Sequence, residues 1–472
     1  MSNKKNQEAY LMKKDTKKNT NEQGLSVINE ATAGIDIGAS SVHVCARGRV
    51  REYSTFTNDL RAMSKWLKEL KITSVAMEST GVYWIPVYDI LEQDGFKALL
   101  VNAHHLKTVS GRKTDVKDCQ WIQKLHSFGL LNGSFRPEGD YLVLRNYVRH
   151  RSKLFQLASA QVQLMHKALT QMNIRLGLVV SDITGQTGIN IIRAIIAGER
   201  NPNTLAKMRS NQNKSTEEEI VKALEGNYRE ELIFELKQSL EAYDFFHTQI
   251  LKCEQAIKTV IDKLERCDVQ QPNVENDDNF PKKGKNGRGL QKKTNYNKSP
   301  YHFDMVSDLQ EILGVDLTKI PGLGVNIILK LISEIGTDMS RWPTAKHFVS
   351  WLGLCPGNKI SGGKILSSKT KPTANKAAQA FRLAAQTLYK SSTALGAFFR
   401  KMRGKFGGPK AITATAHKIA RILYAMLKNR VPFEEMDQAE YERQREKRAF
   451  EFLKRKASDL GFALIEKTAL PA

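Results

Sequence analysis

Four acidic residues lie at positions where their carboxylates can meet. Asp36 lies inside the apolar segment AGIDIGAS, and Glu78 lies near the end of SVAMEST. Both segments are predicted strands, where burial of an unpaired carboxylate is costly. Asp115 and Asp118 are three residues apart, so a helix that begins near Thr114 presents both on one face. The four carboxylates would repel one another unless a cation lies between them.

A divalent cation would remove this repulsion. Oxygen ligands without His or Cys favour Mg²⁺, with Mn²⁺ as the other possibility, and such ions polarise phosphate oxygens and activate an attacking hydroxyl. Taken one at a time, the same acids fit plainer roles as a turn residue, a helix cap or a solvated surface group. The combination favours a metal site held by Asp36, Glu78, Asp115 and Asp118.

Ser361 is a candidate nucleophile in the segment NKISGGKILSSKTKP, residues 358–372, which contains no acid. Gly362 and Gly363 remove side-chain bulk beside the hydroxyl, so a substrate backbone can approach it closely. A serine hydroxyl needs a base or a metal to become a strong nucleophile. By residue type alone, a Ser-Gly-Gly turn is more often a plain loop or a phosphate-binding turn. The chain has no GxxxxGK[ST] pattern, which argues against a P-loop nucleotidase.

Cationic residues and small backbone turns predict contacts to phosphates around this serine. The segment IPGLGV, residues 320–325, is typical of a hairpin whose backbone N–H groups meet a phosphate at a helix start. Pro-Gly turns also open ordinary helices. The predicted nucleic-acid-binding residues are Gly322, Gly324, Lys359, Gly362, Gly363, Lys364, Lys369, Lys371, Lys376 and Arg382.

The composition points to a polyanionic partner. The 472 residues carry 73 Lys and Arg against 49 Asp and Glu, a formal net charge of +24, with a pI of about 9.7. A basic composition that serves only solubility is the alternative. The five cysteines are far apart and form neither a disulfide framework nor a zinc motif. With no membrane-spanning segment and no signal-peptide core, we expect a soluble intracellular protein.

The pattern of elements predicts an α/β domain followed by helices. Three short strands precede alternating helices and strands, which predicts a mixed sheet. Two later segments carry apolar residues at coiled-coil spacing, interrupted once by Arg151, and predict a hairpin joined by a loop around TGQTG or a dimerising arm. The predicted parts are a disordered basic tail (1–31), a catalytic α/β domain (32–139), a helical coiled-coil arm (140–267), a flexible insertion (268–300), a helical domain with the serine (301–432) and a charged helical tail (433–472).

In their order and spacing, five motifs resemble those of a known family. They are GIDIGASSVHV, MESTGVYW, GRKTDVKDCQWIQKLHSFGLL, IPGLGVNIILKLISEIG and LGLCPGNKISGGKILSSKTK. The chain resembles, over about residues 33–432, the DEDD-type transposases of bacterial insertion sequences, which are related to the Piv invertase and act as bridge-RNA-guided recombinases.

The resemblance implies a RuvC-like (ribonuclease-H-like) domain, a coiled-coil arm and a helical transposase domain. It places the family's acids at Asp36, Glu78, Asp115 and Asp118 and its reactive serine at Ser361. It also implies a homotetramer, a dimer of dimers, around donor and target DNA and a structured guide RNA, with Ser361 of one protomer at the acids of another. Cleavage would form a covalent phosphoserine link, and the protein would act in the bacterial cytoplasm at the nucleoid. The basic tail and the 268–300 insertion are longer than the family pattern.

Two other functions remain open from the residues. A junction-resolving, metal-dependent nuclease would use water as its nucleophile, with the helical domain only holding DNA. A nonenzymatic scaffold for RNA and DNA would need neither Ser361 nor the four acids.

Overall fold

The computed structural model describes residues 27–79, 81–102, 115–211, 213–267, 301, 303–434 and 438–463. Most of the expected basic tail and all of the expected 268–300 insertion lie outside these residues. The chain divides into two compact units, Met1–Arg136 and Pro137–Ala472, and each is described by itself. None of the described helices is long and apolar enough to cross a membrane.

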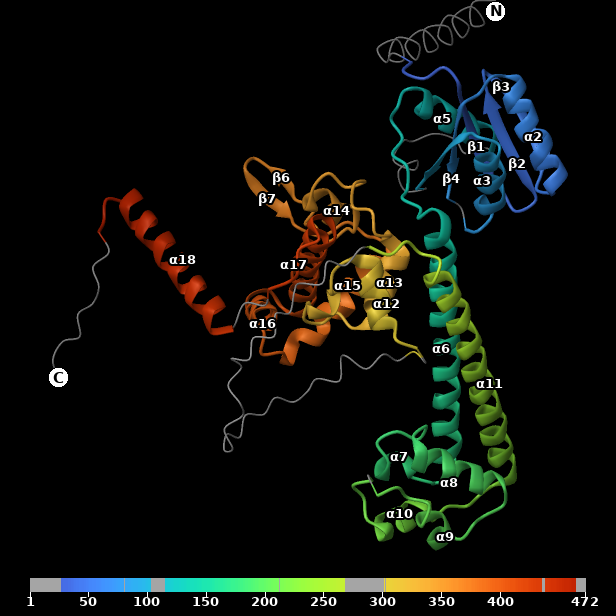
Figure 1. The fold of residues 1–472 in the computed structure, drawn as a ribbon, viewed down its shortest axis with the longest axis vertical. Helices are drawn as coiled ribbons and strands as arrows, with labels where there is room; N and C mark the ends of the chain where they lie inside the picture. Colours follow the sequence, from blue (N-terminus) through green and yellow to red (C-terminus); the bar gives the residue numbers. More distant parts are fainter. Residues whose placement is uncertain are drawn as a thin grey trace, which may run out of the picture. The chain divides into compact units, whose positions relative to one another are not determined.

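The first unit is built on a five-stranded mixed sheet (Figure 1). Its strands are β1 (Thr32–Ile37), β2 (Ser41–Ala46), β3 (Arg49–Ser54), β4 (Ser74–Glu78) and β5 (Lys97–Val101). The strand order is β3-β2-β1-β4-β5. The β3–β2 and β2–β1 pairs are antiparallel, and the β1–β4 and β4–β5 pairs are parallel. The prediction of an α/β domain with a mixed sheet is confirmed.

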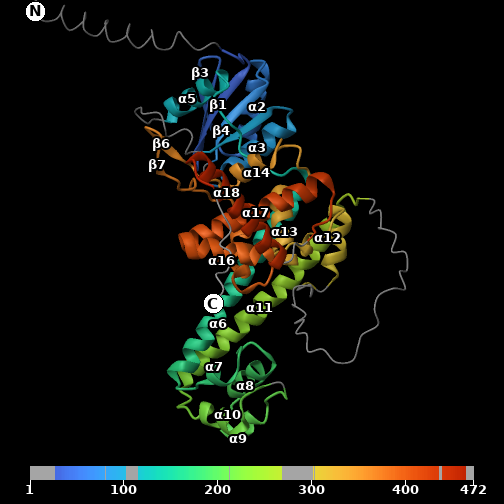
Figure 2. The ribbon, with the colours of Figure 1, turned by 90° about the vertical axis from the view of Figure 1, so that its left-hand side faces the viewer.

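Helices cover both faces of this sheet, and Figure 2 shows α2 and α5 on opposite sides. On one face, α2 (Thr57–Glu69) and α3 (Trp84–Gln93) pack against the main core, which includes Ile35 and Met77. On the other face, α5 (Asp115–Ser127) packs through Ile122 against Ala76 and Val101. Because side chains alternate along a strand, the residues before and after Ile35 and Met77 face α5.

Gly34 allows α5 to lie unusually close to β1. A Cβ atom at residue 34 would overlap the backbone nitrogen of Gln123 and the carbonyl oxygen of Cys119. Both are main-chain atoms of the helix, so they cannot rotate away as a side chain would. The absence of a side chain at this position therefore sets the spacing between helix and sheet.

The second unit begins with the arm, formed by α6 (Gly139–Gln171) and α11 (Glu230–Ile261), which pack along each other (Figure 1). The expected loop around TGQTG is wrong, because four short helices lie between the two long ones. They are α7 (Leu176–Val179), α8 (Gln186–Ile196), α9 (Pro202–Ala206) and α10 (Glu217–Leu224). Their buried residues, among them Ile191, Leu205 and Ile220, form a core with the ends of α6 and α11. This second core makes the segment a folded cap.

Arg151, the break in the apolar stripe of α6, forms a buried polar junction. Its guanidinium donates to Glu254 of α11 at 2.8 and 2.6 Å and to Asn326 of α13 at 3.3 Å. It lies 4.6 Å from the centre of the Phe155 ring and 4.3 Å from that of Tyr301. Burial raises the pKa of Tyr301 to about 12, although the guanidinium lowers it. The buried guanidinium of Arg151 is therefore compensated by hydrogen bonds to α11 and α13 and by stacking on two aromatic rings.

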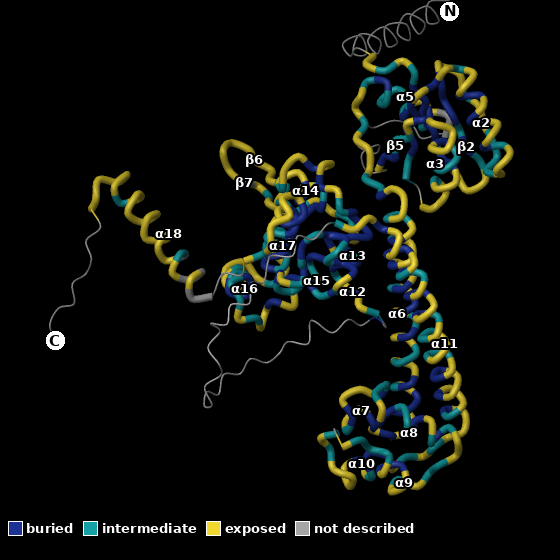
Figure 3. The backbone as a smooth tube through the Cα atoms, in the orientation of Figure 1, coloured by how far each residue is buried: buried dark blue, intermediate teal, exposed yellow. Residues whose placement is uncertain are grey.

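The remaining helices form a domain beside the arm. They are α12 (Met305–Leu313), η2 (Leu317–Lys319), α13 (Val325–Ile335), α14 (Ala345–Trp351), α15 (Lys376–Thr387), η3 (Leu388–Lys390), α16 (Ala394–Phe406), α17 (Gly408–Asn429) and α18 (Gln438–Asp459). Figure 3 shows a buried centre and a largely exposed α18. This part also contains a β-hairpin, β6 (Lys359–Ser361) and β7 (Lys364–Ser367), so it is not purely helical as expected.

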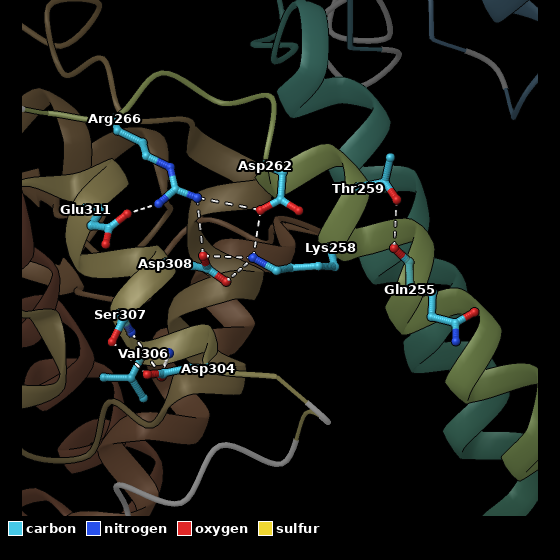
Figure 4. A network of polar contacts seen from close by, with 10 residues as sticks. All are labelled: Gln255, Lys258, Thr259, Asp262, Arg266, Asp304, Val306, Ser307, Asp308 and Glu311. Atoms are coloured by element: carbon cyan, nitrogen blue, oxygen red, sulfur yellow. Dashed lines mark hydrogen bonds and ion pairs between the residues drawn. The ribbon is translucent and has the colours of Figure 1, made fainter.

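Ion pairs attach this domain to the arm, as Figure 4 shows for α11 and α12. Lys258 of α11 donates to both carboxylate oxygens of Asp308 at 2.9 and 2.8 Å, and Arg266 pairs with Glu311. Farther along, Arg149 of α6 binds Glu334 of α13 through two nitrogens at 2.7 and 2.8 Å. The acids of α12 and α13 thus neutralise cations of the arm.

Replacing Gly34 with Ala is expected to loosen α5, because the added methyl group meets helix backbone. Overpacking of this kind costs about 1–3 kcal/mol. Hydrogen exchange measured by mass spectrometry should show faster exchange of the amides of residues 115–127 than in the wild type. Gly404→Ala is the matched control, because a Cβ at residue 404 in α16 meets no atom within 4 Å. Unchanged protection of α5 in Gly34→Ala would contradict the packing described.

Candidate active site

Asp36 and Glu78 end up on neighbouring strands and on the same face of the sheet. In the parallel β1–β4 pair, Ile35 lies opposite Met77, so the next residue of each strand carries a carboxylate at the strand's carboxyl end. Ile35 and Met77 point into the core under α2 and α3. Asp36 and Glu78, one residue further, therefore point to the face covered by α5. Both side chains are partly buried.

The direction of α5 brings its first turn to this end of the sheet. The carbonyl of Ser127, at the end of α5, accepts from the amides of Ile28 and Asn29, just before β1. Gln123 and Cys119 lie over Gly34, so the helix runs antiparallel to β1. Its first residues therefore lie toward Asp36.

The pKa of the Cys119 thiol also reflects the closeness of α5 to Asp36. Burial raises its pKa to about 12, and the charges of Cys45 and Asp36 add to the rise. Cys119 follows Asp118, which is partly buried in the first turn of α5. The expected i, i+3 pair thus lies at the start of a helix whose N-terminal end faces the two strand acids.

Asp115 is the first residue of α5, and its side chain lies outside the described residues. Among the described side chains, no group of three or more His, Cys, Asp or Glu is arranged to hold a metal ion. The three described acids nevertheless share one end of one face, and all supply carboxylate oxygens. This donor set fits a hard cation such as Mg²⁺ or Mn²⁺ rather than zinc.

His43 extends the polar row on this face and escaped the sequence analysis. It lies directly opposite Asp36 in the antiparallel β1–β2 pair, and Glu52 of β3 lies opposite His43. The imidazole Nε2 is 3.8 Å from a carboxylate oxygen of Glu52. Residues opposite each other in a sheet point to the same side, so His43 and Glu52 face the same way as Asp36. The alternation of polar and apolar residues in SVHV indicates that His43 lies on the face opposite the core. That His43 lies beside Asp36 depends on the register between β1 and β2, which the sequence does not reveal.

Val82 and Tyr83, which follow Glu78 closely, are 68% and 48% exposed. The start of α3 beneath them is held in place by Arg136, whose guanidinium stacks on Trp84 and Tyr88 and pairs with Asp89. A rigid base under exposed apolar groups is suited to contact with a substrate beside the acids.

Ser361 lies in the second unit, at the end of β6 and beside the hairpin turn. Gly362 and Gly363 have φ values of 53° and 75°. Positive φ at both central residues is what a two-residue type I′ hairpin turn requires, so the turn itself demands these glycines. The serine is exposed, and its side chain makes no hydrogen bond to any described residue. A hydroxyl in this position is accessible from solvent.

The hairpin carries cations and exposed apolar side chains. Ile360 is 62% and Leu366 70% exposed. The base is held by the Pro356–Thr370 bridge and by the amide of Gly357, which donates to the carbonyl of Lys369 at 2.9 Å. The predicted phosphate-binding residues Lys359, Lys364, Lys369, Lys371 and Lys376 are exposed, and Arg382 is partly buried.

The two glycines of IPGLGV have different surroundings. Gly322 has φ 89°, and a Cβ there would lie 2.7 Å from the carbonyl oxygen of Ala384 in α15. Its space is therefore taken by packing between the turn and α15. Gly324 precedes α13 as its N-cap, and a Cβ there meets no atom within 4 Å. Of the pair, Gly324 is the one open to a ligand.

A wider signal around the hairpin was also missed. Residues 339–433 contain eighteen lysines and arginines and no aspartate or glutamate. Such a span cannot neutralise itself, whereas the arm pairs its cations with acids of α12 and α13. A one-sided charge over a segment of this length is the footprint of a polyanion partner.

Two family models match parts of the chain. Residues 33–174 match the DEDD-type IS110 transposase model, and residues 316–400 match the model described as transposase IS116/IS110/IS902 family. The first match contains all four acids, and the second contains Ser361 and most of the cationic residues around it. A search of curated proteins finds no match. The chain belongs to the DEDD-type, IS110-family transposases, whose domains cut DNA and transfer its strands.

Proposed function

We propose that the protein is a Mg²⁺-dependent DNA recombinase that uses Ser361 as its nucleophile and a structured bridge RNA as its guide. The observation that carries the proposal is the exposed serine at the tip of a cationic hairpin, in a chain that also carries the acidic site of a DEDD domain. A serine so placed has no structural role to explain its position. The cations around it match a phosphodiester.

Asp36, Glu78, Asp115 and Asp118 are the residues that would hold the metal. The ion would polarise the phosphate oxygens and lower the cost of deprotonating the attacking hydroxyl. The carboxylates would compensate for the ion's charge, and the close contact of α5 with β1 holds the Asp118 end of the helix at the strand ends. Mn²⁺ would satisfy the same ligands.

In the proposed step, Ser361 Oγ attacks phosphorus and loses its proton. A new Oγ–P bond forms while the bond from phosphorus to a deoxyribose oxygen breaks, and that oxygen leaves as a hydroxyl after gaining a proton. Attack by a deoxyribose hydroxyl of the other DNA on the phosphoserine reverses these changes and releases the serine. The number of phosphodiesters is conserved, so no free double-strand break is needed.

The guide and the assembly follow from the family resemblance and from the charge. A net charge of +24 is suited to binding donor DNA, target DNA and RNA together. Base pairing with the RNA would select the sequences, while the protein holds backbones. A homotetramer, a dimer of dimers, would bring together the serines and acidic sites needed to cut two DNAs.

A junction-resolving nuclease is the second candidate function. Its support is that the acids form part of a compact unit of their own, which can activate water without Ser361. A nonenzymatic scaffold is weaker, because it leaves the acids at the end of the sheet without a role.

Ser361→Ala is expected to abolish a covalent protein–DNA adduct while DNA binding stays within about twofold, because the backbone and lysines remain. The adduct is measured on denaturing gels with end-labelled DNA and Mg²⁺. Ser368→Ala is the matched control, since Ser368 is also an exposed serine beside the hairpin. Nicked DNA without any adduct in the wild type would favour the nuclease.

Glu78→Gln and Asp118→Asn are each expected to weaken Mn²⁺ binding and to slow DNA cleavage at least about 100-fold. Groups that only orient metal ligands already contribute about 10–100-fold. Electron paramagnetic resonance measures free Mn²⁺ without any turnover. Glu69→Gln, at an exposed acid in α2, should leave both quantities unchanged. Normal metal binding in both site variants would exclude these carboxylates as ligands.

Guidance by RNA predicts that the protein, purified without nuclease treatment, carries one defined RNA. Sequencing should recover a structured molecule with loops complementary to the DNA that flanks the gene. The same purification of an unrelated protein of similar charge controls for bulk RNA. A random mixture of cellular RNA would contradict guidance and leave the serine chemistry untouched.

A further inference from the structure

A second cationic surface lies away from the hairpin. The last turns of α17 pack near α14, where Tyr424 donates to the carbonyl of Trp342 at 2.6 Å and Lys428 to that of Pro343 at 2.9 Å. The first turn of α17 is at the other end of a 22-residue helix, a length of about 33 Å. Figure 1 shows α16 at this other end, away from β6 and β7. The two ends therefore offer separate surfaces.

The turn from α16 to α17 combines cations with exposed aromatic rings. We call Tyr389, Arg403, Lys405, Phe406 and Lys410 the turn patch. The Arg403 guanidinium lies 4.3 Å from the centre of the Tyr389 ring. The ammonium groups of Lys405 and Lys410 lie 5.1 and 6.0 Å from the centre of the Phe406 ring. Phe406 and Tyr389 are 44% and 43% exposed.

These residues form one continuous surface. Arg403 and Phe406 are three residues apart in α16 and so share a face of the helix. Tyr389 contacts Phe399, one turn before Arg403, with ring centres 6.2 Å apart. Lys410 reaches Phe406 from α17 across the turn. Rings and cations therefore alternate along the patch.

The patch is neither covered nor neutralised within the described chain. Arg403, Lys405 and Lys410 are exposed and form no ion pair with a described residue. Cβ atoms at Gly404, Gly407 and Gly408 would meet no atom within 4 Å. The nearby α18 contacts α16, and its Arg448 lowers the pKa of Lys418, after burial as the main cause, while Lys418 stacks on Phe398 of α16.

We propose that the turn patch binds an unpaired nucleic-acid strand, with a base stacked on Phe406 and phosphates on Arg403, Lys405 and Lys410. Cations flanking an exposed ring match a single strand, whose bases present their faces. A duplex hides those faces and offers only phosphates. The inference rests on the proposed function in that the protein handles nucleic acid, but it adds a surface with no part in cleavage.

The test measures binding of the full-length protein to labelled 12-nucleotide strands in a chelator, so that no cleavage occurs. Single-stranded RNA, single-stranded DNA and duplex DNA are compared by fluorescence anisotropy between 50 and 200 mM salt. Removing two phosphate contacts with Lys405→Ala/Lys410→Ala should reduce the slope of log K against log salt by about 1.4 for single strands. Phe406→Ala should weaken single-strand binding about tenfold, and Phe406→Trp should retain it.

The control removes the same charge elsewhere. Lys222→Ala/Lys237→Ala changes two exposed lysines of the cap and arm and should leave the slope near the wild-type value. A strand that carries 5-iodouracil should photocrosslink to the peptide that contains Phe406. Equal slope changes in the two double variants, or equal losses for duplex and single strands in Phe406→Ala, would overturn the proposal.

The binding test of the turn patch and the adduct test at Ser361 can fail independently. If the covalent adduct fails to form but the turn patch binds single strands as expected, the chemistry at Ser361 is wrong and the surface stands. If the adduct forms but the patch variants bind normally, only the surface is wrong. Preference for RNA over DNA in the binding series would assign the patch to the guide, and the reverse preference to an opened DNA strand.

Discussion

The acidic site depends on one contact, the approach of α5 to β1 over Gly34. Backbone atoms of Gln123 and Cys119 occupy the space that any side chain at residue 34 would need. The sheet alone places Asp36 and Glu78 side by side, because their strands are parallel and in register. The helix must lie this close, and antiparallel to β1, for its first turn to bring Asp118 to the same end. A backbone–backbone contact is stiffer than a side-chain contact, which suits a site whose ligands come from two strands and a helix.

Charge is organised in opposite ways in the two parts of the second unit. In the arm, cations are paired: Arg151 with Glu254, Arg149 with Glu334 and Lys258 with Asp308. These pairs fix helices against one another and leave little net field. In residues 339–433 no acid is present, so the eighteen cations there have no acidic partner within the segment, and Arg341 takes its partner, Glu138, from outside it. The same residue types therefore serve assembly of the fold in one part and attraction of a polyanion in the other.

The sequence predicted contacts that follow from periodicity and missed those that follow from register or long-range packing. Parallel strands made the pairing of Asp36 with Glu78 predictable, but His43 faces Asp36 only because the β1–β2 turn sets that register. The cap was read as a loop because its helices are short and gain stability from a core shared with the long helices, as Ile191 shows. Gly362 and Gly363 were noticed for their lack of bulk, whereas their positive φ values explain them more directly. The turn patch brings Lys410 onto Phe406 across a helix boundary, which no single-helix pattern reveals.

The hairpin's construction bears on when the serine reacts. A two-stranded hairpin is marginally stable by itself, and this one is held at its base while Ile360 and Leu366 remain exposed. In the described chain Ser361 has no hydrogen-bonded base, and a serine hydroxyl without one is a poor nucleophile. If the proposed chemistry is right, attack must wait until the exposed tip meets a phosphodiester that the acids already hold. The hydroxyl would then owe its reactivity to the occupied acidic site and its bound phosphodiester, because its own hairpin supplies no base.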